Sequence, residues 1–352
     1  MTMSRIASVG TANPSFSIEQ KLGCELMKKH YSDILRPRSV EVLEKIMEHP
    51  SIRKRHIAVD GILELISFKN ETQEKRIERF TRWGTRLSCD AIRQAIDSAG
   101  VGLEEIRVLV VNTCTGYVCP GLTSYIIEEL GLSKNVKAFD LVGLGCGGAV
   151  PNIDLAQSVL GAQSNGVAVS VAVEICSATY QMGNDMSLIV SNAIFGDGAA
   201  AAVIWNRDSG VELVTARSLI DPVHRDDVRY VYKNGHLHNR LSPHLPEIIG
   251  ETVPGEIQRI CEENGLTPAD IRHWAIHPGG HKMLEQIKSV LGLDEEAMTH
   301  SRNVLKEFGN MSSPSLLFAF KDVLAREIKP GDWCILVGYG AGLSVYTYLL
   351  RA

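Results

Sequence analysis

The hydrophobic pattern of the chain contains a unit that occurs twice. Residues 91–111 (AIRQAIDSAGVGLEEIRVLVV) have the apolar spacing of one helix face, then a glycine, and then an apolar run typical of a buried strand. Residues 256–276 (EIQRICEENGLTPADIRHWAI) repeat this order at a constant offset, with Gly265 in the place of Gly100. Each copy predicts an amphipathic helix, a short link and a buried strand.

The repeat continues further along the chain. Residues 145–160 overlay residues 309–324 as a glycine followed by an apolar helix, and residues 166–173 overlay residues 331–338 as buried strands. Apolar strands that alternate with helices predict parallel pairing, right-handed crossovers and a layered α/β fold. We therefore predict two similar halves, residues 1–206 and 207–352, packed around a pseudo-twofold axis as one compact unit.

Two stretches lie outside the repeat. The more polar segment Glu19 to Arg82 predicts a mainly helical insertion in the first half. The segment Asp221 to Gly250, rich in His, Pro and Arg, predicts a loop-rich insertion in the second half.

Composition narrows the classes of protein. The chain has 352 residues, of which 45% are hydrophobic and 22% charged, with a formal charge of -5. This mild acidity argues against a nucleic-acid-binding protein, and the length excludes a small disulfide scaffold. The first residues lack the pattern of a signal peptide, and no apolar run reaches the roughly 20 residues of a membrane span. We expect a cytoplasmic protein with reduced cysteines and, from cysteine spacing, no metal site.

Cys146 stands in LVGLGCGGA, between an apolar strand and an apolar helix. The flanking glycines allow a sharp turn and the close approach of a ligand. A helix N-terminus lowers the pKa of a thiol and makes the thiolate available as a nucleophile. The simpler interpretation is a buried cysteine beside a glycine-rich turn.

The repeat brings a histidine and an asparagine to the same region. His277, in HWAIHPGGH, ends the strand equivalent to residues 106–111, where α/β sheets present functional groups. Asn310, in EFGNMSSPS, occupies the helix start equivalent to that of Cys146. A structural histidine and a helix N-cap, with the following serines as competing caps, are the simpler interpretations. Convergence near the pseudo-twofold axis favours a Cys, His, Asn site.

These residue types suit acyl transfer. A thiolate can hold an acyl group as a thioester, a histidine can pair with the thiolate, and neutral donors can stabilise an oxyanion. No general-base carboxylate is prominent in the sequence. This favours carbon-carbon bond formation through an enolate that is made by decarboxylation.

Five segments together resemble a known family. LVGLGCGGA, WAIHPGGHKML, EFGNMSSP, AIFGDGAAAAV and GYGAGLSV occur in the order found in the type III polyketide synthases, the chalcone synthase superfamily within the thiolase fold. The resemblance spans essentially the whole chain. It implies a homodimer of αβαβα subunits that loads an acyl-CoA starter, extends it with malonyl-CoA and cyclises the product, with no carrier protein and no cofactor.

The resemblance also assigns roles by motif position. Cys146 would carry the starter and the growing chain, while His277 and Asn310 would polarise the malonyl thioester and hold the enolate oxygen. His277 would also pair with the Cys146 thiolate. Phe195 matches an aromatic gatekeeper, and an ordinary core Phe is its simpler interpretation. The matching cavity-lining positions are Cys114, Thr115, Cys119, Cys176, Thr179 and Ser312.

Three positions differ from the plant members of this family and affect which substrate is expected to fit. Cys119 replaces a Met that reaches the partner's cavity in plant enzymes, so that contact is expected to be smaller. The second plant gatekeeper, a Phe, falls within HLHNRLSPHLP, where no Phe is present. Cys176 resembles bacterial relatives that open a tunnel for a long acyl chain. It favours fatty acyl starters and alkylpyrone or alkylresorcinol products.

For the CoA phosphates, the best match to the family's basic cluster is Lys45, together with Arg53, Lys54 and Arg55. The simpler interpretation of such a charge run is solvated surface.

Three other functions stay open. A ketoacyl synthase of the same fold would take its extender from acyl carrier protein and stop after one condensation. A papain-like thiol hydrolase also uses Cys, His and Asn, but does not explain the repeat. A non-catalytic scaffold would bind acyl-CoA without turnover.

Overall fold

The computed structural model describes residues 3–161, 166–233, 235–326 and 328–352. Within these residues the main feature is a nine-stranded mixed sheet. From one edge to the other its strands are β11 (Ile271–Ile276), β12 (Trp333–Gly340), β13 (Ser344–Arg351), β8 (Val211–Ile220), β1 (Arg5–Ala12), β7 (Asp197–Trp205), β6 (Val167–Ile175), β4 (Ile106–Thr113) and β5 (Lys137–Val142).

The two halves of the chain contribute strands in the same order. The repeated strands β4 and β6 are parallel neighbours, as are β11 and β12. Each parallel pair continues into two antiparallel strands, β7 and β1 in the first half and β13 and β8 in the second. These antiparallel strands lie outside the repeated segments, so the repeat does not predict them.

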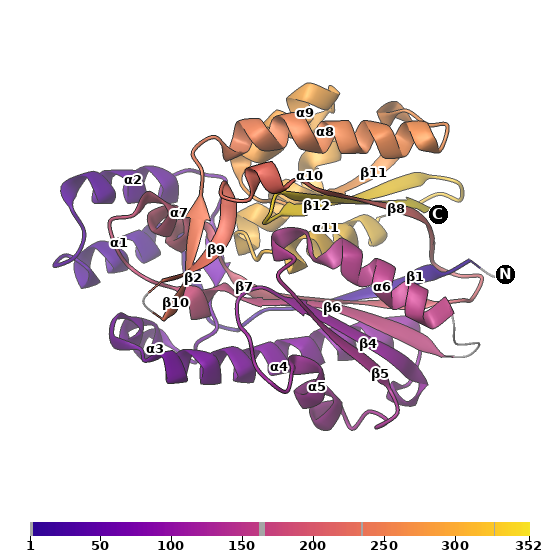
Figure 1. Ribbon diagram of the computed structural model, residues 1–352, viewed down its shortest axis with the longest axis horizontal. Coiled ribbons are helices and arrows are strands. Elements are labelled where there is room, and N and C mark those ends of the chain that lie inside the picture. Colours follow the sequence, from indigo (N-terminus) through magenta and orange to yellow (C-terminus); the bar gives the residue numbers. More distant parts are fainter. Residues whose placement is uncertain (1–2, 162–165, 234, 327) are drawn as a thin grey trace.

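The elements form layers (Figure 1). Two helices lie between the two groups of strands, α6 (Ala149–Gly161) and α11 (Pro314–Leu324). The outer helices are α4 (Gln73–Ala99) and α5 (Leu122–Leu130) on the first half, and α8 (Leu245–Glu263), α9 (His281–Leu291) and α10 (Glu295–Phe308) on the second. The predicted fold, internally duplicated αβαβα layers, is confirmed.

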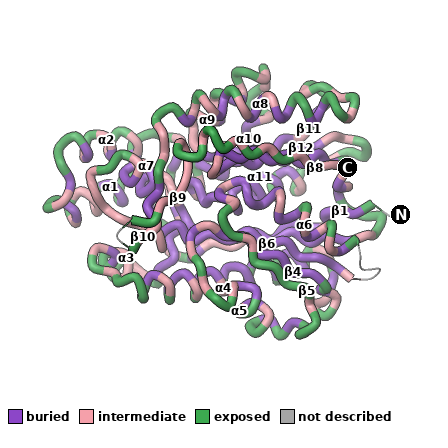
Figure 2. Tube along the Cα trace, in the orientation of Figure 1, coloured by how far each residue is buried: buried purple, intermediate pink, exposed green. Residues whose placement is uncertain are grey.

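The two central helices are apolar because strands cover them on both sides. α6 packs on β4 and β6 and also on β12 and β13, while α11 packs on β1, β7 and β11. Helix α11 is buried along most of its length (Figure 2), and its Leu316, Leu317 and Phe320 are almost fully buried. Burial of each such side chain contributes about 1.5–3 kcal/mol. This core fixes the N-terminal ends of both helices, where Cys146 and Asn310 lie.

The insertions differ in how well their structure was predicted. The segment Glu19 to Arg82 is mainly helical, as predicted, with a small two-stranded sheet. Its elements are β2 (Ser17–Glu19), α1 (Gln20–His30), α2 (Pro37–Met47), β3 (Lys54–His56), α3 (Ile62–Ser67) and the start of α4. The prediction of loops over Asp221 to Gly250 was wrong, because a hairpin, β9 (Val228–Lys233) and β10 (His236–Leu241), fills much of it and the first residues of α8 end it. The remaining helix is α7 (Met186–Ile194).

Candidate active site

Cys146 lies on a tight turn between β5 and α6. The turn is a single 3-10 turn, Gly145–Gly147, and α6 begins only at Ala149. Gly145 has a φ of 61°, and a Cβ there would come within 2.8 Å of Ala341. Glycine is therefore required by both the backbone conformation and the close approach of the loop after β12.

His277 and Asn310 come from the second half of the chain. His277 directly follows β11, and its amide donates to Val337 of β12 at 2.8 Å. Asn310 follows Gly309, whose φ of 71° matches that of Gly145. The backbone carbonyl of Asn310 accepts from Gly196, next to Phe195.

A series of hydrogen bonds connects the three residues. The Ser312 hydroxyl lies 3.2 Å from Cys146 Sγ, and the Ser312 amide donates to Asn310 Oδ1 at 2.7 Å. Asn310 Nδ2 donates to the Gly279 carbonyl at 3.0 Å, and the Gly279 amide donates to the His277 carbonyl at 2.9 Å. The structure thus brings the predicted Cys, His and Asn together through Ser312 and the turn after β11.

Burial dominates the electrostatics of this site. It raises the pKa of the Cys146 thiol to about 12, so the expected lowering by a helix N-terminus is wrong. Desolvation outweighs the dipole because the side chain is enclosed and α6 starts three residues later. Burial also lowers the pKa of His277 to about 3.

The ion pair between Cys146 and His277 stays a prediction. Within the described residues no hydrogen bond connects the two side chains, and His277 Nδ1 has no partner. The imidazole packs edge to face on Tyr339, with ring centroids 5.2 Å apart. A neutral histidine can still donate one N–H to a substrate oxygen.

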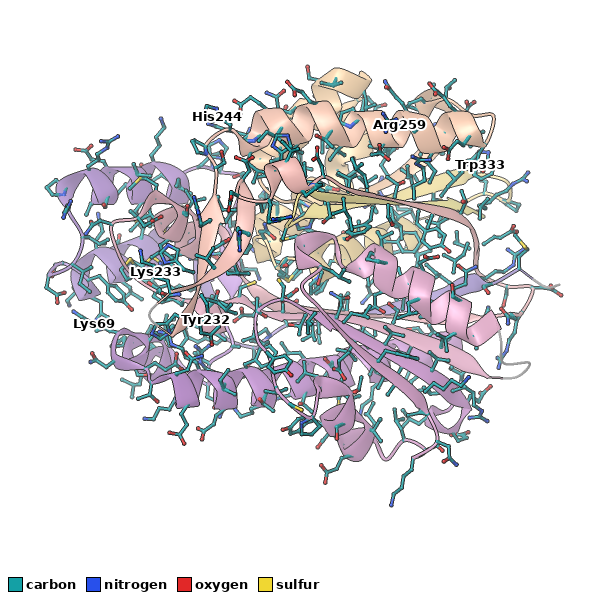
Figure 3. The ribbon with its side chains drawn as sticks, viewed as in Figure 1. Lys69, Tyr232, Lys233, His244, Arg259 and Trp333 are labelled. Atoms are coloured by element: carbon teal, nitrogen blue, oxygen red, sulfur yellow. The ribbon has the colours of Figure 1, made fainter. Side chains whose placement is uncertain are left out.

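A cavity of about 660 Å³ opens in front of Cys146. The predicted pocket residues that line it are Cys114, Thr115, Thr179, Phe195 and Ser312. Cys176 instead lines a second cavity of about 350 Å³. Thr179, Phe195 and Asn239 line both cavities, so the two adjoin. Tyr232 lines the first cavity and Lys69 lines the second, and Figure 3 labels both residues.

Two predicted residues lie away from both cavities. Lys45 is exposed on α2, and Cys119 is exposed on the loop after β4, beside a third, shallower hollow. Neither lines the cavity of Cys146 or that of Cys176.

Two arginines of the basic run near Lys45 have structural partners, and the role of Lys45 at the CoA phosphates stays a prediction. Arg53 pairs with Glu19 at 2.8 Å and also with Glu307. Arg55 is buried and donates to the carbonyls of Asn192 and Phe195 at 2.7 and 2.8 Å. These guanidinium groups are already occupied by protein acceptors.

Two site residues are not evident from the sequence pattern. Tyr230, on hairpin strand β9, lines the main cavity, and burial raises the pKa of its hydroxyl. Glu174, near the end of β6, is fully buried and accepts a hydrogen bond from Ser312. No general-base carboxylate is prominent in the sequence, and the structure places this one beside Ser312. A single acidic residue at the end of the apolar run GVAVSVAVEI was the available signal.

Comparison with known proteins agrees with this architecture. Residues 14–224 match a family model described as FAE1/type III polyketide synthase-like protein, and residues 212–352 match the C-terminal domain of chalcone and stilbene synthases. Within the described residues no helix has the length and apolar character to cross a membrane.

Individual relatives cover most of the chain. The alpha-pyrone synthesis polyketide synthase-like Pks18 of Mycobacterium tuberculosis is 30% identical over 357 residues, which is 98% of this chain and 90% of the relative. A 3,5-dihydroxyphenylacetyl-CoA synthase of Streptomyces toyocaensis is 30% identical over 293 residues, 80% of this chain and 75% of the relative. The crystal structure of 1,3,6,8-tetrahydroxynaphthalene synthase from Streptomyces coelicolor superposes with a TM-score of 0.90 at 26% identity, covering 99% of both chains.

These matches extend over both halves of the chain and include the turn of Cys146, the end of β11 and the start of α11. The chain belongs to the type III polyketide synthases, which are acyltransferases that form carbon-carbon bonds.

Proposed function

We propose that this enzyme loads an acyl-CoA starter on Cys146, extends it repeatedly with malonyl-CoA, and cyclises the product to a pyrone or resorcinol. The observation that carries the proposal is the connected set of Cys146, Ser312, Asn310 and the His277 turn beside one cavity. A thiol nucleophile and two hydrogen-bond donors beside one cavity suit thioester chemistry.

In the proposed cycle Cys146 acts as the nucleophile, and His277 and Asn310 act as hydrogen-bond donors. Cys146 Sγ attacks the starter carbonyl, and the thiol of CoA leaves. His277 and Asn310 then donate to the malonyl thioester oxygen while carbon dioxide departs, and the enolate carbon attacks the Cys146 thioester. Asn310 Nδ2 carries two hydrogens. One of them donates to the Gly279 carbonyl, and the second can donate to the malonyl thioester oxygen.

The second cavity supports a fatty acyl starter. Its wall is mainly apolar, with Leu26 of α1, Leu65 of α3 and Leu188 of α7, and it adjoins the main cavity at Phe195. An acyl chain that enters it from Cys146 would exchange water for hydrocarbon contacts. Pks18, named for alpha-pyrone synthesis, is among the relatives.

We also propose a homodimer that forms through the edge strand β5. Five of its six residues are exposed, including Phe139 and Val142. Tyr117, on the loop after β4, is 70% exposed and lines the mouth of the main cavity together with Val142. A second copy that pairs with this edge would cover apolar surface and close the cavity mouth.

The test of the proposed reaction is mass spectrometry of products and intact enzyme after incubation with malonyl-CoA and starters from acetyl to long-chain acyl-CoA. Pyrones or resorcinols, together with an acyl adduct on Cys146, are expected. Activity on carrier-protein thioesters alone would favour a ketoacyl synthase. Binding of acyl-CoA without an adduct would favour the non-catalytic scaffold.

A further inference from the structure

Arg76 of α4 is a buried cation that the proposed reaction does not use. It is only 7% exposed, yet it lines the main cavity in front of Cys146. Two other arginines on this cavity differ from it, because Arg225 is exposed and Arg229 pairs with Asp226 at 3.0 Å. A charge that is removed from water is costly unless an opposite charge lies beside it. The groups that balance the charge of Arg76 are therefore informative.

The acidic partner of Arg76 is shared with a second arginine. Glu71 accepts hydrogen bonds from Nε and Nη2 of Arg79, both at 2.8 Å, so both carboxylate oxygens are used. Arg76 Nε lies 3.7 Å from the same carboxylate and has no hydrogen-bond partner within the described residues. Two positive groups thus face one negative group in this buried cluster, which leaves one positive charge in excess.

Part of the Arg76 guanidinium is left for a ligand. Its Nη1 donates to the Tyr180 carbonyl, and its Nη2 makes no hydrogen bond in the part of the chain that the structure describes. Tyr180 lines the second cavity, and its neighbour Thr179 lines both cavities. Arg76 therefore lies close to the place where the two cavities adjoin, with N–H groups that a ligand oxygen can use.

The growing chain would carry oxygen atoms past this place. In the proposed reaction, two extensions leave two ketones between the Cys146 thioester and the alkyl tail of the starter. The tail suits the apolar second cavity, so the two ketones lie between that cavity and Cys146, on the side of Arg76. Two ketones separated by one carbon form a β-diketone, which is a weak acid because its enolate shares the negative charge between both oxygens.

We propose that Arg76 binds this β-diketone as its enolate and thereby directs ring closure through oxygen, to a pyrone. The carbon between the two ketones loses a proton to water, and the negative charge is held beside the guanidinium. The distal enolate oxygen attacks the thioester carbon, the carbon-sulfur bond breaks, and Cys146 leaves as the thiolate. One released proton balances one anion at each stage. This inference rests on the proposed function, because it concerns the chain which that function makes.

The surroundings of Arg76 favour an anion over a neutral ketone. An opposite charge within about 4–6 Å stabilises the charged form of an acid and shifts its titration by about 1–3 pH units. Burial, and to a smaller extent Arg76, lowers the pKa of His236 on β10, which disfavours the charged form of this histidine. Arg55, the buried cation of the second cavity, already makes three hydrogen bonds to protein acceptors. The titratable groups that face Arg76 are Tyr31, Glu71, Arg79 and His236.

The test uses a long-chain alkyl β-diketone as a probe, because its enolate absorbs at a longer wavelength than its neutral form. The absorbance of the bound probe between pH 6 and 9 gives the pH at which half of it is enolate. We expect this midpoint to be about 1–3 pH units lower on wild type than for the free probe. In Arg76→Met the midpoint should rise by about one pH unit or more, because the excess positive charge is lost.

Lys75→Met is the matched control. Lys75 precedes Arg76 on α4, is exposed and lines neither cavity, so this variant removes the same charge and introduces the same side chain. Its midpoint should equal that of wild type. Arg76→Lys keeps the charge without the planar donor group, and its midpoint should lie between those of wild type and Arg76→Met. Arg76→Met should fold, because Glu71 keeps both hydrogen bonds from Arg79, and thermal unfolding checks this.

The second measurement is the ratio of pyrone to linear acids made from a long-chain acyl-CoA and malonyl-CoA. Below the midpoint the enolate population falls tenfold per pH unit, so Arg76→Met should lower this ratio about tenfold at pH 7. Equal midpoints for wild type and Arg76→Met, or a wild type that forms only carbocyclic rings, would overturn the inference. A lowered midpoint in a wild type that makes no polyketide would refute the proposed function and still support the enolate site.

Discussion

At the scale of single residues, burial dominates this site. Desolvation raises the pKa of Cys146 and lowers that of His277, so it disfavours the charged form of each group and gives weight to hydrogen-bond donors that are already in place. Asn310 is such a donor, and its amide is held by Gly279 and Ser312. Preorganised donors stabilise an oxyanion without reorganising during the reaction.

Asn310→Ala should therefore slow malonyl-CoA decarboxylation by about 10²-fold, the usual effect of losing one oxyanion donor. The measurement is release of acetyl-CoA from malonyl-CoA by chromatography. Cys146→Ala should abolish the acyl adduct but keep both donors. Near-normal decarboxylation in the Asn310 variant would remove this residue from its proposed role.

The low pKa of His277 also predicts a pH dependence of stability. The free imidazole of the unfolded chain binds a proton below pH 6.5, whereas the buried one does so only near pH 3. The unfolded state thus binds more protons between these values, and the free energy of unfolding falls as pH decreases, by about 1.4 kcal/mol per unit.

Between pH 7 and pH 5, His277→Gln should lose about 2 kcal/mol less stability than wild type. Urea unfolding at pH 7, 6 and 5 measures this difference. Burial also lowers the pKa of other histidines, such as His56 and His300. Both proteins contain these residues, so their effects on the free energy of unfolding cancel in the comparison. Parallel curves for the two proteins would contradict the prediction.

At the scale of elements, the sequence predicted the helices and strands whose apolar residues recur with a regular spacing. The repeat identified α4 with β4, α8 with β11, and the equivalent positions of Cys146 and Asn310, because apolar spacing reflects burial. It could not predict the hairpin β9 and β10, whose strands are only partly buried. The repeat also could not predict that Glu174 lies beside the site, or that Arg53 and Arg55 each bind protein acceptors. Contacts between side chains that are distant in the sequence leave no periodic signal.

Packing between β12 and the Cys146 turn gives a test at this scale. A Cβ at Gly340 would come within 2.7 Å of the Cys146 amide nitrogen. Gly340→Ala should displace the turn, slow starter loading at least tenfold and lower stability by about 1–3 kcal/mol. Gly255→Ala, in α8 with open space around it, should load normally and be slightly more stable. Loading by stopped flow and thermal unfolding distinguish the two variants.

The second cavity gives another test. Leu65 of α3 lines it, whereas Leu22 of α1 is 50% exposed and lines neither cavity. Leu65→Trp should reduce loading of long-chain acyl-CoA about tenfold, equivalent to roughly 1.4 kcal/mol of lost contact, and leave acetyl-CoA unaffected. Leu22→Trp should change neither substrate. An equal loss for both starters in the Leu65 variant would place the acyl chain elsewhere.

At the scale of the whole molecule, the shared central layer makes the two halves one unit. α6 from the first half packs on strands of the second, and α11 does the reverse. The catalytic residues lie where this layer meets the strand ends, so neither half contains a complete site. Among the described residues the sheet has two edge strands, β11 and β5, and β5 is the more exposed of the two.

If β5 pairs with its counterpart in a second copy, charge on that edge should separate the subunits. Phe139→Lys should shift the protein from dimer to monomer in size-exclusion chromatography with light scattering, because a buried lysine without a partner is costly. Val290→Lys, on the exposed surface of α9, should remain dimeric. The monomer should also release more hydrolysed acids than cyclic products, since Tyr117 and Val142 then leave the cavity mouth open to water. A monomeric wild type, or a dimeric Phe139 variant, would show that β5 is not the interface.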